Sequence, residues 1–427
     1  MRTLLTIWIG QFASLLGSEM TNFAITIWAW EVSDRATALS FILVAQQIPR
    51  LLISPFAGII CDRFSRKHLM LLGDFVAGLS TIVLLVLFLS DRLEIWHLYI
   101  SGAINGLFGY IQALAYSASM SLMVAKQHYA RAAALQSLQI SGGYVLAPAL
   151  AGSIYAIAGL GSILAIDLST FVVAIITLSL VSVPQPNSSK TDATSTSPRL
   201  QQLTFGLRYL WTRPSLLALL SFFLINNFID SLNFAILPAM VLARSGNDAT
   251  IVGTLYAFFG AGGAIGGLTI SIWGGPKRRI HGVLTGNIIW KFGLVVLALA
   301  QRTSVKMGTA FVSGFCSPFP SSSSQAIWMA AVEPEVQGRV FATRFFLGQL
   351  AAPLGAAIAG PLADRVFEPA MQPGGTLASI LGSIFGTGQG AGMALQMTLV
   401  SICGAIVALG GYGIRQLRRV ELEKTEA

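Results

Sequence analysis

Long apolar segments separated by short polar loops run along almost the whole chain. About 20 apolar residues are enough to span a bilayer as a helix, and the pattern predicts twelve such segments. They are 4–30, 37–60, 68–89, 96–119, 133–156, 160–183, 215–241, 249–273, 282–301, 305–331, 340–362 and 391–414. The first continues past Glu19 to Trp30 without a small-residue cleavage site, so we interpret it as a helix rather than a signal peptide.

One long polar stretch divides the segments into two sets of six. It runs from Pro184 to about Gln202, and its Ser, Thr, Asn and Pro cannot pack a core. The spacing of Leu203, Leu207 and Leu210 then predicts a short amphipathic helix on the inner membrane face. We therefore predict an N-terminal six-helix bundle over 1–186, a cytoplasmic linker over 187–213 and a C-terminal six-helix bundle over 214–427.

The two halves are similar in sequence. An acid followed three residues later by Asn-Phe-Ala-Ile occurs at Glu19 in the first segment and at Asp230 in the seventh. An Ala-Gly pair also occurs in both halves, as Ala151-Gly152 in the fifth segment and as Ala359-Gly360 in the eleventh. This duplication predicts two bundles related by a pseudo-two-fold axis along the membrane normal, with a binding site between them.

Composition and charge support a membrane protein. Hydrophobic residues make up 54% of the chain and charged residues 11%, whereas about 25% of a soluble domain is charged. Eighteen of the 27 Lys and Arg residues fall on the side of the N-terminus and six on the other side, which predicts that both termini are cytoplasmic. The net charge of +9 is therefore an orientation signal and does not indicate nucleic-acid binding.

Motifs for catalysis or nucleotide binding are absent from the sequence. It has no phosphate-binding G-x-x-x-x-G-K-[ST] loop, no HExxH and no GxSxG. Cys61, Cys316 and Cys403 lie in or next to apolar segments without metal-ligand spacing. We expect no enzyme activity, cofactor or metal, and an ion gradient rather than ATP as the energy source.

The loop after the second segment carries part of a known motif. Its matching residues are Gly58, Asp62, Arg63, Arg66 and Lys67. The loop resembles the G-x-L-A-D-R-x-G-R-K signature of the major facilitator superfamily of transporters, with Cys61 and Ser65 as departures. The resemblance implies a gating loop whose acid holds the start of the eleventh helix, where a carboxylate is favoured by about 0.3–1 kcal/mol. Positive-inside placement explains the three basic residues equally well.

Further stretches are similar to the drug and siderophore exporters of this superfamily, the branch that includes macrolide efflux proteins. They are Leu52–Gly58, Gly206–Trp211, Gln337–Phe341 and Phe367–Met371. The spacing of Gly143, Pro148 and Gly152 is a looser relative of the family's antiporter motif, although small residues also suit ordinary helix packing. The resemblance implies an all-α fold of twelve transmembrane helices in two bundles, with a cavity lined by helices 1, 4, 7 and 10.

Four charged residues lie deep in apolar segments, where a charge costs about 2.5–3.5 kcal/mol. The acids Glu19 and Asp230 lie past the middle of their helices, and the cations Arg50 and Lys291 lie at mid-depth. We predict that the acids take up and release protons to drive transport, with the cations as counter-ions or as competitors for the carboxylates. The alternative is that each acid is neutralised by a cation and serves packing alone.

Other polar and aromatic residues complete the predicted site. The cavity residues are Asn22, Asn226, Asn227, Asn233, Tyr110, Gln112, Tyr116, Gln325 and Trp328. Aromatic faces with sparse polar groups suit large, partly apolar ligands. Asp74 and Arg344 lie nearer the inner face, where we expect structural or gating ion pairs, and Asp167 is predicted to be a polar anchor at a helix end.

These observations predict a secondary transporter that exports drug-like or siderophore-like small molecules by proton antiport. We expect a monomer in the inner membrane whose partners are the small-molecule substrate, protons and the lipid bilayer. Two alternatives remain open, a receptor or scaffold that keeps the fold without transport and an uptake permease.

Overall fold

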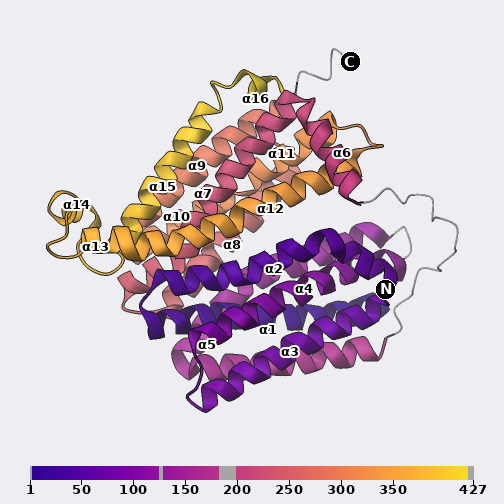
Figure 1. Ribbon diagram of the computed structural model, residues 1–427, viewed down its shortest axis with the longest axis horizontal. Coiled ribbons are helices and arrows are strands. Elements are labelled where there is room, and N and C mark those ends of the chain that lie inside the picture. The colour runs from indigo at the N-terminus through magenta and orange to yellow at the C-terminus, as the bar shows by residue number, and fades with distance from the viewer. Residues whose placement is uncertain (1, 125–127, 182–198, 422–427) are drawn as a thin grey trace. The chain divides into compact units, whose positions relative to one another are not determined.

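The computed structural model describes residues 2–124, 128–181 and 199–421. In the described residues, each of the twelve predicted segments is mostly helical, and no strand is present (Figure 1). Within these described ranges, eight helices are long and apolar enough to cross a membrane, and one of them, Ala134–Ser179, covers most of the fifth and sixth segments. The predicted all-α membrane fold is confirmed.

The first of two compact units comprises residues 1–194 and 247–257. Its helices are α1 (Arg2–Ser33), α2 (Ala36–Arg63), α3 (Arg66–Leu89), α4 (Ile95–Met123) and α5 (Tyr129–Ser179). The long α5 consists of two helices joined at Gly159, which has a φ of 69°. Glycine adopts this left-handed conformation without steric penalty, so the fifth and sixth predicted segments meet there. Within the unit, α1 packs along α5, and α4 packs against α2 and α3.

The second unit comprises residues 195–246 and 258–427. Its longer helices are α6 (Arg199–Trp211), α7 (Pro214–Ser245), α9 (Arg279–Leu299), α10 (Thr303–Cys316), α11 (Pro318–Ala331), α12 (Gln337–Leu362) and α15 (Ala391–Gly410), while α8 (Ala249–Trp273) has residues in both units. The tenth predicted segment is divided between α10 and α11, because Pro318 has no amide hydrogen to continue the helical ladder. α7 packs along α12 and α15, and α15 packs along α9.

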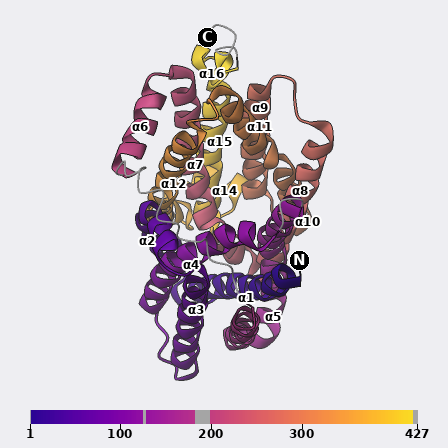
Figure 2. The same ribbon diagram turned by 90° about the vertical axis from the view of Figure 1, so that its right-hand side faces the viewer.

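The segment between α12 and α15 forms short helices at one end of the second unit. They are η2 (Ala363–Phe367), α13 (Glu368–Met371) and α14 (Ala378–Phe385). Figures 1 and 2 show α14 near the start of α15 and α16 (Arg415–Arg419) at its far end. The Glu368 carboxylate accepts hydrogen bonds from the backbone amides of Gly390 at 3.2 Å and Met393 at 2.8 Å. A carboxylate here satisfies free amides at the start of α15, so it fastens the segment to the unit.

The predicted amphipathic helix corresponds to α6, whereas residues 187–198 of the predicted linker lie outside the described residues. After α6, Arg213 donates hydrogen bonds to Glu333 Oε1 at 2.7 Å and to the Ala331 carbonyl at 3.1 Å. The Tyr209 hydroxyl donates to Glu333 Oε2 at 3.1 Å. Hydrogen bonds from Arg213 and Tyr209 hold the pKa of the Glu333 carboxyl below its usual value. The junction of α6 and α7 is thereby attached to the end of α11.

Helices α8 and α10 cross at very short range through glycines. A side-chain carbon on Gly266 of α8 would overlap the carbonyl oxygen of Phe315, and one on Gly314 of α10 would overlap that of Phe259. Close packing of small residues is a main source of helix association in membranes. These glycines therefore set the distance between the two helices.

Replacing Gly314 by Val is expected to push α10 away from α8. Overpacking of this kind costs about 1–3 kcal/mol, so thermal unfolding of the purified variant in detergent should occur at a lower temperature. Gly308→Val is the matched control on the same helix, because nothing lies within 4 Å of a side-chain carbon placed there. If the unfolding temperature fell equally in both variants, the close crossing of α8 and α10 would not be the reason for glycine at residue 314.

Candidate functional site

α7 and α9 bring an acid and a base together inside the second unit. Lys291 Nζ lies 2.5 Å from Asp230 Oδ1, and the indole nitrogen of Trp290 donates to the same oxygen at 2.9 Å. The lysine side chain has no exposed surface, whereas 26% of the aspartate side chain is accessible. An unpaired charge at such a place is unfavourable. Each side chain of the pair therefore satisfies the other, and part of the carboxylate surface stays accessible.

The packing around this pair makes room for the lysine and joins the acid, through Trp290, to a cluster of rings. A side-chain carbon on Gly404 of α15 would lie 2.8 Å from Lys291 Cε, so glycine there leaves space for the lysine stem. The rings of Phe234, Phe259 and Trp290 form a cluster with centroids 5.8–6.3 Å apart. The second unit thus presents a partly accessible carboxylate whose partner, Trp290, belongs to an aromatic cluster.

Four predicted site residues come together in the first unit. Glu19 of α1 is half-buried, accepts a hydrogen bond from the Asn22 side chain and experiences the positive charge of Arg50 on α2. The Arg50 guanidinium lies 5.4 Å from the ring centroid of Tyr110 on α4. A cation–π contact of this kind contributes about 0.5–1 kcal/mol at an exposed site. This cluster therefore holds its acid with one amide and one nearby cation.

The asparagines of the duplicated sequence lie in different surroundings in the two units. Asn22 is half-buried beside its acid, but Asn233 is buried and donates to Ser401 Oγ on α15 at 3.0 Å. Asn226 is also buried and donates to a carbonyl of its own helix at 2.9 Å. Asn227 is exposed and donates to a carbonyl of α12 at 3.3 Å. The repeat in sequence therefore does not extend to side-chain contacts.

Three predicted cavity residues make contacts inside their own units. Gln112 donates to Asp74 Oδ1 at 2.6 Å. Tyr116 is 5% exposed among apolar side chains of the first unit, and Trp328 is 0% exposed in the core of the second. Because these three side chains are already packed or hydrogen-bonded within their units, we do not propose them as substrate-binding residues.

Arg344 of α12 has neutral partners. Its guanidinium donates to Gln325 Oε1 at 2.9 Å and to Ser324 Oγ at 3.4 Å, and it lies 4.8 Å from the ring centroid of Trp328. Among the residues that the structure describes, no carboxylate forms an ion pair with it. The ion pair predicted at Arg344 is therefore wrong for this arrangement, in which amide, hydroxyl and indole groups surround the charge.

Asp74 of α3 is the centre of a buried polar cluster. Its side chain is 1% exposed and accepts hydrogen bonds from Gln11 at 2.8 Å, Gln112 at 2.6 Å and Ser14 at 3.5 Å. In the described part of the chain its partners are neutral, so the ion pair predicted for Asp74 is also wrong. Three donors from α1 and α4 replace the expected cation.

Asp74→Leu is expected to destabilise the protein, because it removes the acceptor of the Gln11 and Gln112 side-chain amides, the first of which is buried. Each buried donor left without a partner costs about 1–3 kcal/mol. Asp74→Asn keeps one acceptor oxygen and should lose less. Thermal unfolding in detergent measures both variants, and a wild-type unfolding temperature for Asp74→Leu would contradict a structural role for the cluster.

The sequence predicted that Asp167 is a polar anchor at a helix end. In the structure it lies inside the first unit instead. It is 5% exposed and accepts hydrogen bonds from Thr21 of α1 at 3.0 Å and Thr81 of α3 at 2.9 Å. A signal for these buried acids was present on α1, whose polar residues recur every three or four positions and share one face. That polar face consists of Gln11, Ser14, Ser18 and Thr21.

The loop between α2 and α3 is fastened to the ends of other helices. Gly58 lies within α2, and Asp62 and Arg63 are exposed at its end. Arg66 donates to a carbonyl near the end of α4 at 2.5 Å, and Lys67 donates to two carbonyls at the end of α5 at 2.7 and 3.0 Å. Cations stabilise helix C-termini, where carbonyls lack partners. Two basic residues of the loop thus have a structural role in the first unit.

An all-α chain that spans a bilayer and buries ionisable groups in its helices has the features expected of a membrane transporter. The family model described as Major Facilitator Superfamily matches residues 7–356. The chain therefore belongs to the Major Facilitator Superfamily, which confirms the family predicted from the loop motif. Membership makes it a multi-pass membrane transporter of small molecules and not an enzyme.

Relatives within the superfamily include efflux proteins. Macrolide efflux protein A of Streptococcus pyogenes is 26% identical over 365 residues, which cover 84% of this chain and 89% of that protein. The enterobactin exporter EntS of Shigella flexneri is 27% identical over 213 residues, 50% of this chain and 48% of that protein. The crystal structure of a bacterial homologue of the human lysosomal transporter Spinster, inward-facing and unoccupied, has a TM-score of 0.70 at 14% identity and covers 99% of this chain and 97% of that one. At this identity the structural match supports the fold alone.

Proposed function

We propose that this protein exports drug-like or siderophore-like small molecules across the inner membrane in exchange for protons. The observation that carries the proposal is the ion pair of Asp230 and Lys291. A proton on Asp230 removes the counter-ion of a fully buried ammonium, and its departure restores the pair. Because each event changes how α7 and α9 interact, proton binding is linked to the conformation of the second unit.

The first unit provides a second acid with the same chemistry and a different cation. Glu19 lies near Arg50, and the Asn22 side chain donates a hydrogen bond to its carboxyl group. A group that exchanges protons needs access to water, and Glu19 is half-buried while Asp74 and Asp167 are enclosed by donors. Glu19 and Asp230 are therefore our coupling residues, and alternating access is the mechanism that they would drive.

The proposed substrate class is supported by aromatic rings, and the proposed direction of transport is supported by the relatives of this chain. Phe234, Phe259 and Trp290 offer aromatic surface in the same unit as Asp230, and such surface suits a large, partly apolar ligand. The relatives described above include a macrolide efflux protein and an enterobactin exporter, which favours export of comparable compounds. The proposal includes a monomer with both termini in the cytoplasm.

Inside-out membrane vesicles that contain the protein test this proposal. An acidic lumen should drive labelled macrolides or siderophores from a panel into the vesicles, and a protonophore should abolish the accumulation. Vesicles without the protein provide the background. An uptake permease would move its substrate in the opposite direction, and a receptor or scaffold would move none, so either result would replace the proposed function.

A further inference from the structure

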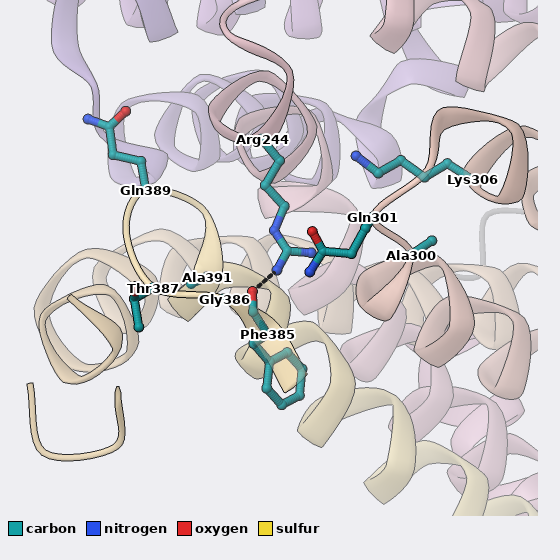
Figure 3. Close-up of a pocket in the computed structure, with 9 residues that line it drawn as sticks. All are labelled: Arg244, Ala300, Gln301, Lys306, Phe385, Gly386, Thr387, Gln389 and Ala391. Atoms are coloured by element: carbon teal, nitrogen blue, oxygen red, sulfur yellow. Dashed lines mark hydrogen bonds between the residues drawn. The ribbon is translucent and has the colours of Figure 1, made fainter. Parts of the chain in front are cut away.

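The second unit contains a pocket near the start of α15 (Figure 3). Its volume of about 170 Å³ far exceeds the roughly 10–15 Å³ that one water molecule needs in the same measure. The end of α7, the start of α10 and the loop between α14 and α15 line it. Its charged and polar members are Arg244, Gln301, Lys306, Thr387 and Gln389.

Lys306 is a buried cation that faces this pocket. Its side chain is 3% exposed, and Figure 3 shows its ammonium end on the side toward Arg244. No group in the described part of the chain forms a hydrogen bond or an ion pair with this ammonium. An ammonium has three donors, and burying a charge without partners is unfavourable. Lys306 therefore needs an acceptor that enters from the pocket.

Arg244 supplies a second positive charge in a fixed position. It donates hydrogen bonds to the carbonyl oxygens of Ala298 at 2.6 Å and Phe385 at 2.5 Å, the second of which is drawn in Figure 3. A guanidinium has five donors, so others remain for a ligand. The charges of Arg244 and Lys306 oppose each other. The two cations are therefore brought together against their mutual repulsion.

The acid that acts electrostatically on Arg244 is Glu368, and its carboxylate already has partners. Both of its oxygens accept hydrogen bonds from backbone amides at the start of α15. Glu368 does not line the pocket. Its charge is thus shared with the helix terminus, and the pocket itself keeps two cations without an acid among its lining residues.

We propose that this pocket binds a phosphate-type oxyanion, either free phosphate or the phosphate of an anionic lipid head group. Guanidinium and ammonium groups both match phosphate oxygens, and such charge-assisted hydrogen bonds are strong. Gln301, Thr387 and Gln389 are exposed and place neutral polar groups at the entrance. The site shares no residue with the ion pair of Asp230, so it goes beyond the proposed export function.

Free phosphate is the first probe, with purified protein in detergent and chloride at matched ionic strength as the reference. Phosphate should raise the unfolding temperature of the wild type, and Lys306→Met should weaken phosphate binding by about ten-fold or more. Lys306→Arg should retain binding. Arg302→Gln is the matched control, because Arg302 is exposed and does not line the pocket.

A second variant keeps the test informative if Lys306→Met fails to fold. Gln301 is exposed and lines the pocket, and Figure 3 shows its amide beside the Arg244 guanidinium, so Gln301→Glu should fold normally and bring a competing carboxylate to the cations. Its response to phosphate should be lost. A full phosphate response in this variant, or in a folded Lys306→Met, would overturn the proposal.

Lipid nanodiscs distinguish the two sources of phosphate. The probes are phosphatidylglycerol and phosphatidylcholine in equal amounts, and native mass spectrometry measures which lipid stays bound. Retention of phosphatidylglycerol that depends on Lys306 identifies an anionic lipid, and a phosphate response without lipid preference identifies the free anion. If neither probe distinguishes the wild type from the pocket variants, no oxyanion site exists here.

Discussion

Asp230→Asn is expected to abolish proton-driven export and to destabilise the second unit. The substitution leaves Lys291 without its counter-ion at a place where its side chain has no exposed surface. Removing one partner of a buried ion pair costs about 3–5 kcal/mol. Thermal unfolding in detergent and transport in inside-out vesicles measure the two losses separately. Glu335→Gln, which removes an exposed acid, is the control and should change neither.

The double variant Asp230→Asn with Lys291→Met separates coupling from packing. Replacing both partners of a buried pair with neutral side chains is often close to neutral for stability, so most of the unfolding temperature should return. Export should remain absent, because no carboxylate is left at residue 230 to bind a proton. Recovery of both stability and proton-driven export would show that the pair serves packing alone, the alternative that the sequence leaves open.

Glu19→Gln is expected to remove proton-driven export with little effect on stability. Glutamine keeps an acceptor oxygen for Asn22 and cannot release a proton. Arg50 is exposed, so it can remain charged without its acid. We expect the free energy of unfolding to change by less than about 1 kcal/mol, while protonophore-sensitive accumulation falls to that of vesicles without the protein.

Asp167→Asn in the same unit is the matched control for Glu19→Gln, since both replace an acid with its amide. Two threonines donate to Asp167 at 2.9 and 3.0 Å, so this variant should lose stability and keep coupling in the fraction that folds. Wild-type coupled export by Glu19→Gln would remove Glu19 from the mechanism. The mechanism would then rest on Asp230 alone.

Much of the architecture could be predicted from the sequence, because the length of an apolar segment is a local property. A bilayer requires about 20 apolar residues per helix, and all twelve predicted segments are mostly helical in the described residues. Local chemistry also marks where helices break, as at Gly159 and Pro318. The loop motif at Gly58–Lys67 likewise predicted the family, which the match over residues 7–356 confirms.

The sequence alone determined the number of spans, the family and the presence of buried charges, whereas the tertiary structure decided which of these groups meet. Lipid and protein interior are both apolar, so an apolar helix carries little information about its rotation. Hence the sequence could not pair Lys291 with Asp230, or give Asp74 and Arg344 their neutral partners. The pocket of Arg244 and Lys306 likewise depends on segments far apart in the chain, because only tertiary packing brings the ends of α7, α9 and α14 together.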